Sequence, residues 1–324
     1  MFSMKKSLKV AIVAAGIISA PIIANTLIFK TAGAKAKKRD GRGNLTSEKN
    51  YKWEYGNIRY TKTGNGGKPL LLLHDITPGG GGFEWEKTIS QLSEHYTVYV
   101  PDLLGFGRSE KPGVSYSSFL YATMINNFIK NVIKKPAYVA ASSVSASIAL
   151  ASYCLTPENM IKLMLISPIG AGCTNKSALN RDSFMKKLLE SHYIGAITYN
   201  ILSSRLFKAW QLKRYEFKNT AAINTSFLNK YYYSAHSGGV NSRLPIAALA
   251  SGFLHVDIER LISRAEIPVH CIWGEENQLN PLSNFAYLEK QNESISLAVF
   301  KDTKTLPHYE NPKAFCKECR WFFR

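Results

Sequence analysis

The feature that most constrains the fold is a series of short, continuous apolar runs separated by segments with helical spacing. The first run covers residues 69–74, and later runs cover residues 96–100, 137–140, 163–166 and 269–273. Continuous apolar runs of this length are typical of strands that are covered on both faces, and strands that alternate with helices form parallel sheets. The sequence therefore predicts an α/β fold with a mostly parallel, doubly wound sheet.

Two further elements are predicted beside these runs. Residues 58–61 alternate between apolar and polar side chains, as a strand with one solvated face does. Residues 84–95 have helical spacing, with Trp85, Ile89 and Leu92 on one side. Both elements extend the alternation of strands and helices.

The N-terminal segment has the pattern of a membrane anchor. Lysines precede an apolar run over residues 10–29, which is long enough as a helix to cross about 30 Å of hydrocarbon. We therefore expect an N-terminal transmembrane helix within residues 1–30 and a basic linker over residues 31–50. A cleaved signal peptide is the alternative, with residues 32–34 as its cleavage site. The basic residues after the run favour a main domain on the cytoplasmic face.

The net charge of +18 is concentrated in two blocks of the chain. Residues 1–42 contain nine Lys and Arg against Asp40, and residues 170–256 contain eleven against three acidic residues, so each block carries +8. Basic residues mixed with Trp and Tyr in the second block suit a surface that rests on anionic lipid headgroups. The alternative is that these aromatic side chains form a core or line a pocket. No nucleic-acid-binding motif is present, so nucleic acid is not an expected partner.

The five cysteines are scattered and predict no disulfide framework, which favours a reducing compartment. Cys316 and Cys319 have the spacing of a redox or metal pair. Without a second such pair nearby, we interpret them as buried helix residues. No metal site and no cofactor is therefore expected.

Several longer motifs resemble the α/β-hydrolase fold family. They are residues 72–74 before a glycine-rich turn, residues 101–112 (PDLLGFGRSEKP), residues 267–274 and residues 307–312. The resemblance covers residues 57–168 and 257–324, and it implies an α/β-hydrolase domain over residues 51–324. The segment between the two parts, about residues 170–256, corresponds to the helical cap of that family.

The resemblance also implies where a nucleophile would lie. In this family a serine occupies a G-x-S-x-G turn between a strand and a helix, and residues 141–145 (ASSVS) match that turn with small residues in place of glycine. Ser143 matches the nucleophile. The backbone N–H groups of Val144 and Ile76 match the oxyanion hole. The alternative for this segment is a helix N-terminus with serine caps.

The positions that match the family's acid and base are substituted. Asn277 stands at the acid position, and Glu276 could replace it if the loop is shifted. Thr305 stands at the base position, so His308 is the first choice for an imidazole in this region, and His236 and His255 of the cap are more remote choices. Asp75 adds a negative charge beside the expected oxyanion hole, which opposes the charge that develops in acyl transfer.

Two functions follow from this pattern. The first is a membrane-anchored serine hydrolase of ester or acyl substrates, with Ser143 as nucleophile, His308 as base and Asn277 or Glu276 orienting it. The second is a catalytically inactive relative that keeps the fold to bind a lipid, a small molecule or a protein partner. A lipophilic ligand and an anionic membrane surface are the expected partners in the first case.

Overall fold

The computed structural model describes residues 28–29, 31, 47–172, 187–191 and 194–324. Within these residues, one eight-stranded sheet has the order β1-β2-β4-β3-β5-β6-β7-β8. The pairs β1–β2 and β2–β4 are antiparallel, and the remaining pairs are parallel. The predicted α/β class with a mostly parallel sheet is therefore confirmed. The strands are β1 (Ser47–Trp53), β2 (Gly56–Thr63), β3 (Pro69–Leu73), β4 (Thr97–Pro101), β5 (Ala137–Ser142), β6 (Met160–Ile166), β7 (Val269–Gly274) and β8 (Ser296–Phe300).

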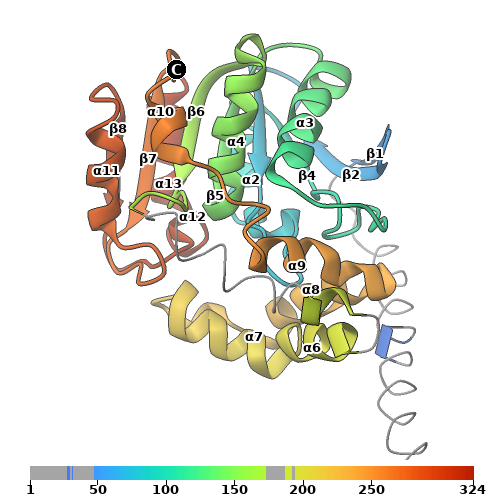
Figure 1. The fold of residues 1–324 in the computed structure, drawn as a ribbon. Helices are drawn as coiled ribbons and strands as arrows, with labels where there is room; N and C mark the ends of the chain where they lie inside the picture. Colours follow the sequence, from blue (N-terminus) through green and yellow to red (C-terminus); the bar gives the residue numbers. More distant parts are fainter. Residues whose placement is uncertain (1–27, 30, 32–46, 173–186, 192–193) are drawn as a thin grey trace, which may run out of the picture.

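Helices cover both faces of this sheet (Figure 1). Leu71 and Leu73 of β3 pack into a core with α3, α4 and α10, while Leu70 and Leu72 pack into a second core with α2 and α13. Successive side chains of a strand point to opposite faces, so one apolar run supplies both cores. The helices outside the cap are α2 (Ile89–Leu92), α3 (Ser118–Phe128), α4 (Ser143–Leu155), α10 (Ile258–Ile262), α11 (Phe285–Glu289), α12 (Pro307–Glu310) and α13 (Pro312–Phe322).

The chain between β6 and β7 forms a helical cap at one end of the sheet (Figure 1). Two polar contacts fix the cap to the loop that follows β3. The Ser234 hydroxyl donates to the Gly80 carbonyl at 2.9 Å, and the Lys208 ammonium donates to the Thr77 hydroxyl at 3.1 Å. The cap therefore lies over the carboxyl end of β3. Its helices are α6 (Ile194–Leu202), α7 (Arg205–Gln211), α8 (Thr225–His236) and α9 (Leu244–Ala250).

Short 3-10 and π-helical turns complete the architecture. They are η1 (Gly82–Trp85), η2 (Ile129–Ile133), η3 (Pro157–Asn159), η4 (Leu212–Glu216), η5 (Thr220–Ala222), η6 (Gly239–Arg243) and η7 (Leu282–Asn284). One of them corrects a prediction, because residues 84–95 are not one helix but η1 followed by α2. This break turns Glu84 inward, where its side chain is only 3% exposed. The strand β1 also begins at Ser47, inside the range predicted as linker.

The predicted anchor over residues 1–30 lies outside the described residues, apart from Ile28 and Phe29. Among the described residues, no helix has the length and apolar content needed to cross a membrane. Phe29 is buried, and its ring lies 5.1 Å from that of His236 in the cap. Cys316 and Cys319 are buried in α13 against the sheet, as interpreted from the sequence. No cluster of potential metal ligands occurs in the described part of the chain.

Candidate functional site

Ser143 occupies the junction between β5 and α4, at the carboxyl edge of the sheet. Strand β5 ends at Ser142 and helix α4 begins at Ser143 itself, so the chain reverses within one residue. Ser143 has a φ of 52°, in a region that non-glycine residues rarely adopt. Such strain persists only where the surrounding structure imposes it, and it concentrates at functional sites. This is the strand–turn–helix geometry that the sequence predicts for residues 141–145.

The residues that flank Ser143 are small and closely packed. Ala141 is fully buried, and Ser145 is 1% exposed. The Ser145 hydroxyl donates a 2.6 Å hydrogen bond to the carbonyl of His74, at the end of β3. Serine in place of glycine therefore ties the turn to the neighbouring strand.

Two backbone N–H groups beside Ser143 point at one position. The N–H of Ile76 lies 2.7 Å from Asp75 Oδ1, and the N–H of Val144 lies 3.2 Å from the same oxygen. These are the two donors expected from the sequence to form an oxyanion hole. The structure brings them together, and the oxygen between them belongs to Asp75.

The surroundings of Asp75 favour its neutral form. Burial raises the pKa of this carboxyl to about 7, and the nearby carboxylates of Glu84 and Glu216 add to the effect. The hydrogen bonds from Val144 and Ile76 oppose the shift by lowering the pKa. An ordinary aspartate would be fully ionised at neutral pH, whereas this one is present in both forms.

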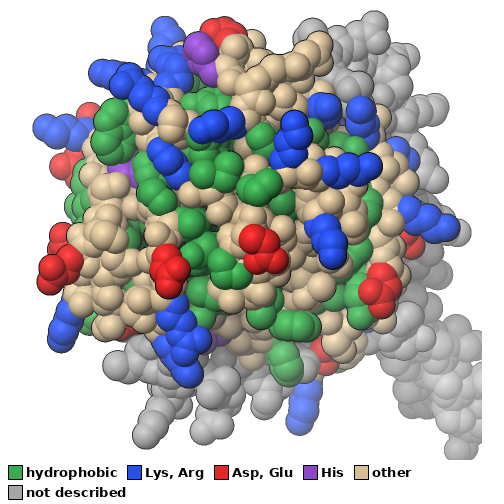
Figure 2. Space-filling model, turned by 90° about the horizontal axis from the view of Figure 1, so that it is seen from above, with side chains coloured by type: hydrophobic (Ala, Val, Ile, Leu, Met, Phe, Trp, Pro, Cys, Tyr) green, Lys and Arg blue, Asp and Glu red, His purple; other side chains and the backbone are tan. Residues whose placement is uncertain are grey.

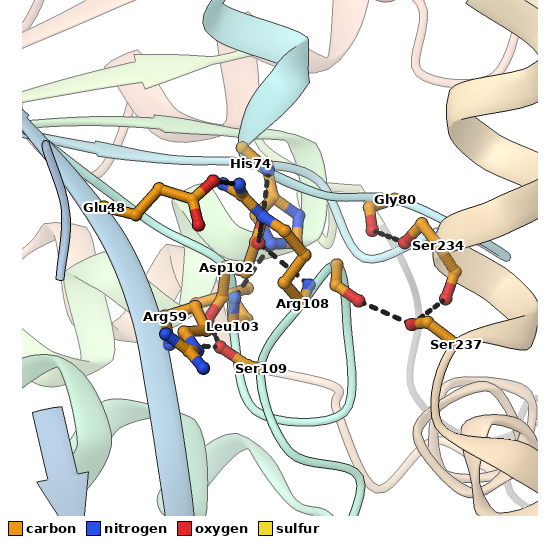
Figure 3. Close-up of polar contacts among 12 residues, drawn as sticks. Glu48, Arg59, His74, Gly80, Asp102, Leu103, Arg108, Ser109, Ser234 and Ser237 are labelled. Carbon is orange, nitrogen blue, oxygen red and sulfur yellow. Dashed lines mark hydrogen bonds and ion pairs between the residues drawn. The ribbon is translucent and has the colours of Figure 1, made fainter. Parts of the chain in front are cut away.

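His74 holds the backbone of this loop in place. Its Nδ1 donates to the Asp75 carbonyl at 2.8 Å, and its Nε2 accepts from the N–H of Leu103 at 2.9 Å. A ring nitrogen that accepts from an N–H carries no proton, so these partners fix the tautomer with hydrogen on Nδ1. The imidazole therefore joins the ends of β3 and β4 (Figure 3).

The motif at residues 101–112 holds the glycine-rich loop beside the site through hydrogen bonds of Asp102. Asp102 accepts from the N–H of Gly82 at 2.7 Å and from the N–H of Arg108 at 2.9 Å (Figure 3). A Cβ on Gly107, whose φ is 49°, would lie 2.1 Å from the Asp102 carboxyl carbon. Glycine is therefore required there, and the motif has a structural role.

The two positions that match the family's acid and base contact each other. Beyond the ends of β8 and β7, the Thr305 hydroxyl lies 3.2 Å from Asn277 Oδ1 and 3.1 Å from the Tyr215 carbonyl, and its single proton is shared between these two acceptors. The same Asn277 oxygen also accepts from the N–H groups of Leu279 and Asn280. Neither side chain titrates near neutral pH, so this pair does not accept a proton there.

His308 is committed to another partner. Its Nε2 lies 2.9 Å from Glu84 Oε1, its ring stacks on Trp85, and it is fully buried. No histidine in the described part of the chain makes a hydrogen bond to the Ser143 hydroxyl; His236, for example, bonds Asn200 and the Tyr232 carbonyl. The role of His308 as a base stays a prediction, and its geometry does not favour that role.

Glu276, the second candidate for an orienting group, lies at the surface. Its carboxylate is 2.7 Å from the Lys218 ammonium in a solvent-accessible ion pair. The hydrogen bonds of the described residues do not join Glu276 to His308 or Ser143. Its predicted catalytic role therefore has no contact to support it.

Comparison with known proteins decides the family. The family model described as "alpha/beta hydrolase fold" matches residues 68–312. The chain belongs to the α/β-hydrolase fold family. Its relatives include a pimeloyl-[acyl-carrier protein] methyl ester esterase of Aliivibrio fischeri, with 23% identity over 267 residues, 81% of this chain and 96% of that protein.

Solved structures of α/β-hydrolases have the same fold. A serine hydrolase involved in carbazole degradation superposes with a TM-score of 0.66 at 18% identity, covering 86% of this chain and 99% of that chain. A membrane phospholipase A superposes with a TM-score of 0.67 at 19% identity, covering 99% and 97%. At these identities the likeness establishes the fold.

This α/β-hydrolase also has a buried ion pair that sequence reasoning missed. Lys208 Nζ of the cap lies 3.1 Å from Glu216 Oε1 and 4.2 Å from the centre of the Tyr231 ring. Lys208 is 1% exposed and Glu216 is 6% exposed. The eight-residue spacing of the two residues within a basic segment gives no sequence signal that they are buried. The pair lies within the cap, and the Lys208 ammonium also donates to the Thr77 hydroxyl at 3.1 Å, which connects the cap to the loop after β3.

A cleft of about 1120 Å³ lies away from Ser143, between β2, β4 and helix α8. The Arg108 guanidinium in this cleft pairs with Glu48 and lies 3.4 Å from Asp102 (Figure 3). The Lys230 ammonium pairs with Glu86. The charged residues that line the cleft are four cations and four carboxylates, so its lining has no net charge that would favour an anionic ligand.

Proposed function

We propose that this α/β-hydrolase family member binds a lipophilic ester or acyl ligand at a membrane surface without histidine-assisted turnover. The observation that carries the proposal is that Thr305 and Asn277, whose side-chain oxygens lie 3.2 Å apart, occupy the two positions where a base and an acid are expected. A serine hydroxyl without a positioned base is a weak nucleophile near neutral pH. The pairing of His308 with Glu84 supports the same conclusion.

The ligand class is taken from the relatives. An esterase and a phospholipase A are among the proteins that this chain resembles, and both act on acyl compounds by their names. The cap and the turn at Ser143 are kept, and the proposal is that they bind such compounds beside Ser143, which is itself only 2% exposed. The alternative of a protein partner has no specific contact in its favour.

A second candidate function is a serine hydrolase, and the backbone of Ser143 favours it. Ser143 has a φ of 52°, which is the strained backbone of a nucleophile turn. An ordinary helix start does not require this strain, so its presence favours a nucleophile. The two candidates differ in whether the Ser143 hydroxyl reacts.

Fluorophosphonate labelling tests that difference. We expect wild-type protein and the Ser143→Ala variant to be equally unlabelled, because loss of the base in a comparable triad costs about 10⁶ in rate. Labelling would be measured by intact mass. Covalent modification of the wild type that disappears in Ser143→Ala would establish the hydrolase instead.

Methyl octanoate tests binding and turnover in one sample. We expect it to raise the melting temperature of the protein, because a ligand that binds the native state stabilises it by RT ln(1 + [L]/Kd). Chromatography of the same sample is expected to show no released octanoate. An unchanged melting temperature would contradict the binding proposal, and Ser143-dependent release of octanoate would contradict the absence of turnover.

The membrane part of the proposal rests on the outer surface of the cap. Helices α6 and α7 expose four large apolar side chains, with Lys213 and Arg214 exposed just beyond α7. Their exposed fractions are 57% for Ile194, 58% for Ile201, 86% for Leu206 and 52% for Trp210. Apolar side chains flanked by cations suit the interface of an anionic bilayer, where each cation contributes about 1 kcal/mol. The anchor and the cytoplasmic orientation expected from the sequence belong to the same proposal.

Flotation with liposomes tests the cap surface. Protein lacking residues 1–42 is expected to float with anionic vesicles at low salt, and the double change Leu206→Glu and Trp210→Glu is expected to abolish flotation. The face of the molecule turned away from the cap also carries Lys and Arg, interspersed with acidic residues (Figure 2). Lys290→Glu, far from the cap, is therefore a charge-matched control. If Lys290→Glu lost flotation to the same extent, or if the double variant still floated, the cap would not be the surface that contacts the membrane.

A further inference from the structure

The side chain of Asp75 occupies the point where two backbone donors converge. The contact with the N–H of Ile76 is local, since the two residues are neighbours, and it recurs in ordinary turns. The contact with the N–H of Val144 is not local, because it joins residues 69 positions apart on different elements. Donors from two elements that meet at one oxygen are the arrangement that stabilises an oxyanion in acyl transfer.

The backbone of Asp75 is fixed on both sides of this carboxyl group. Its N–H donates to Glu84 Oε2 at 2.9 Å, and its carbonyl accepts from His74 Nδ1 at 2.8 Å. Asp75 is a partly exposed residue, and its χ1 torsion has other staggered wells. A change of χ1 would carry the carboxyl group away from the two donors while the loop stays in place.

We propose that Asp75 is a specificity-determining residue whose carboxyl group fills the oxyanion hole and excludes the carbonyl oxygen of an ester from it. This inference rests on the proposed function, since both concern a ligand at the Ser143 site. It adds a second reason for slow turnover that is independent of the missing base. A carbonyl oxygen can reach the two N–H groups only after the Asp75 side chain has moved away.

The charged groups around Asp75 come from every element packed against it. Glu84 approaches from η1 and Glu216 from η4, and both raise its pKa after burial, the largest cause. Lys208 of α7 pairs with Glu216, and His308 of α12 pairs with Glu84, while Tyr231 of α8 lies over the Lys208 ammonium. His74 contacts the Asp75 backbone. Near pH 7 both forms of Asp75 are present, and the ionised form holds the two donors more strongly.

Formate is a direct probe of the position between the two N–H groups, because it is a carboxylate like that of Asp75 but is not attached to the chain. In the Asp75→Gly variant we expect formate, but not chloride, to raise the melting temperature with a dissociation constant on the order of 1 mM, the range that three heavy atoms can reach. Wild-type protein and Asp75→Asn are expected not to respond, since their side chains keep an oxygen between the donors. A folded Asp75→Gly protein that ignores formate, or a wild type that responds equally, would overturn the proposal.

A measurement on the wild type keeps the proposal testable if the glycine variant does not fold. The amide proton resonances of Ile76 and Val144 are expected to shift together as the pH passes through about 7, and to stay constant in Asp75→Asn. Amide shifts that are the same in both proteins would contradict the contact. Neither experiment uses a lipophilic ligand or Ser143 reactivity, so failure of the proposed function and failure of this inference give different results.

Discussion

Replacing Glu84 by Ala is expected to lower the free energy of unfolding by about 3 kcal/mol, because it leaves two buried polar groups without their hydrogen-bond partner. Glu84 is 3% exposed and His308 is fully buried, with 2.9 Å between Glu84 Oε1 and His308 Nε2. Without the carboxylate, the Nε2 of His308 and the N–H of Asp75 lose their partner inside the protein. An unpaired buried polar group costs more than the bond itself contributes.

The loss can be measured by urea denaturation at pH 7. Glu94→Ala is the matched control, because Glu94 is exposed in the same segment and its change is expected to cost less than about 0.5 kcal/mol. Burial alone would raise the pKa of Glu84, but the hydrogen bond and charge of His308 outweigh it and hold the pKa below its usual 4.5. Its contribution is therefore complete above pH 4.5 and is lost as the pH falls further. Equal destabilisation by Glu84→Ala and Glu94→Ala would contradict the buried pair.

Replacing Asp75 by Asn is expected to stabilise the protein above pH 7, by up to about 4 kcal/mol. The folded-state pKa of about 7 lies above the unfolded value of 3.8, so the native state binds the proton more tightly. Compared with the variant, the wild type is therefore most stable below pH 3.8. It loses that stability progressively as the pH rises from 3.8 to about 7. Asparagine keeps an oxygen for the N–H groups of Ile76 and Val144 but carries no charge.

The comparison requires unfolding free energies of both proteins at pH 4, 6 and 8. The difference between Asp75→Asn and wild type is expected to be small at pH 4 and to reach its full value at pH 8. Titrating groups distant from Asp75 contribute equally to both proteins and cancel, whereas Glu84 and Glu216 also lose the repulsion of its carboxylate in the variant. A difference that does not depend on pH would show that folding does not raise the pKa of Asp75, and would contradict this prediction.

Much of the fold could be predicted because it depends on local patterns. The apolar run at residues 69–74 became β3, and the small residues around Ser143 became the turn between β5 and α4. The strand β8 was missed although residues 297–300 are apolar, because a run of four does not distinguish a strand from a short helix. The break between η1 and α2 was missed because Trp85, Ile89 and Leu92 keep helical spacing across it.

The sequence by itself determined the strands β2 to β7, the serine turn, the two oxyanion donors and the loss of ionisable groups at Asn277 and Thr305. Only the tertiary structure decided which partner each buried polar group takes. His308 pairs with Glu84 across 224 residues, and Asp75 meets Val144 across 69. A local sequence pattern sets the backbone conformation. A buried polar group is instead stabilised by the partners that the folded chain brings within about 3 Å of it, and residue spacing in the sequence does not predict those partners.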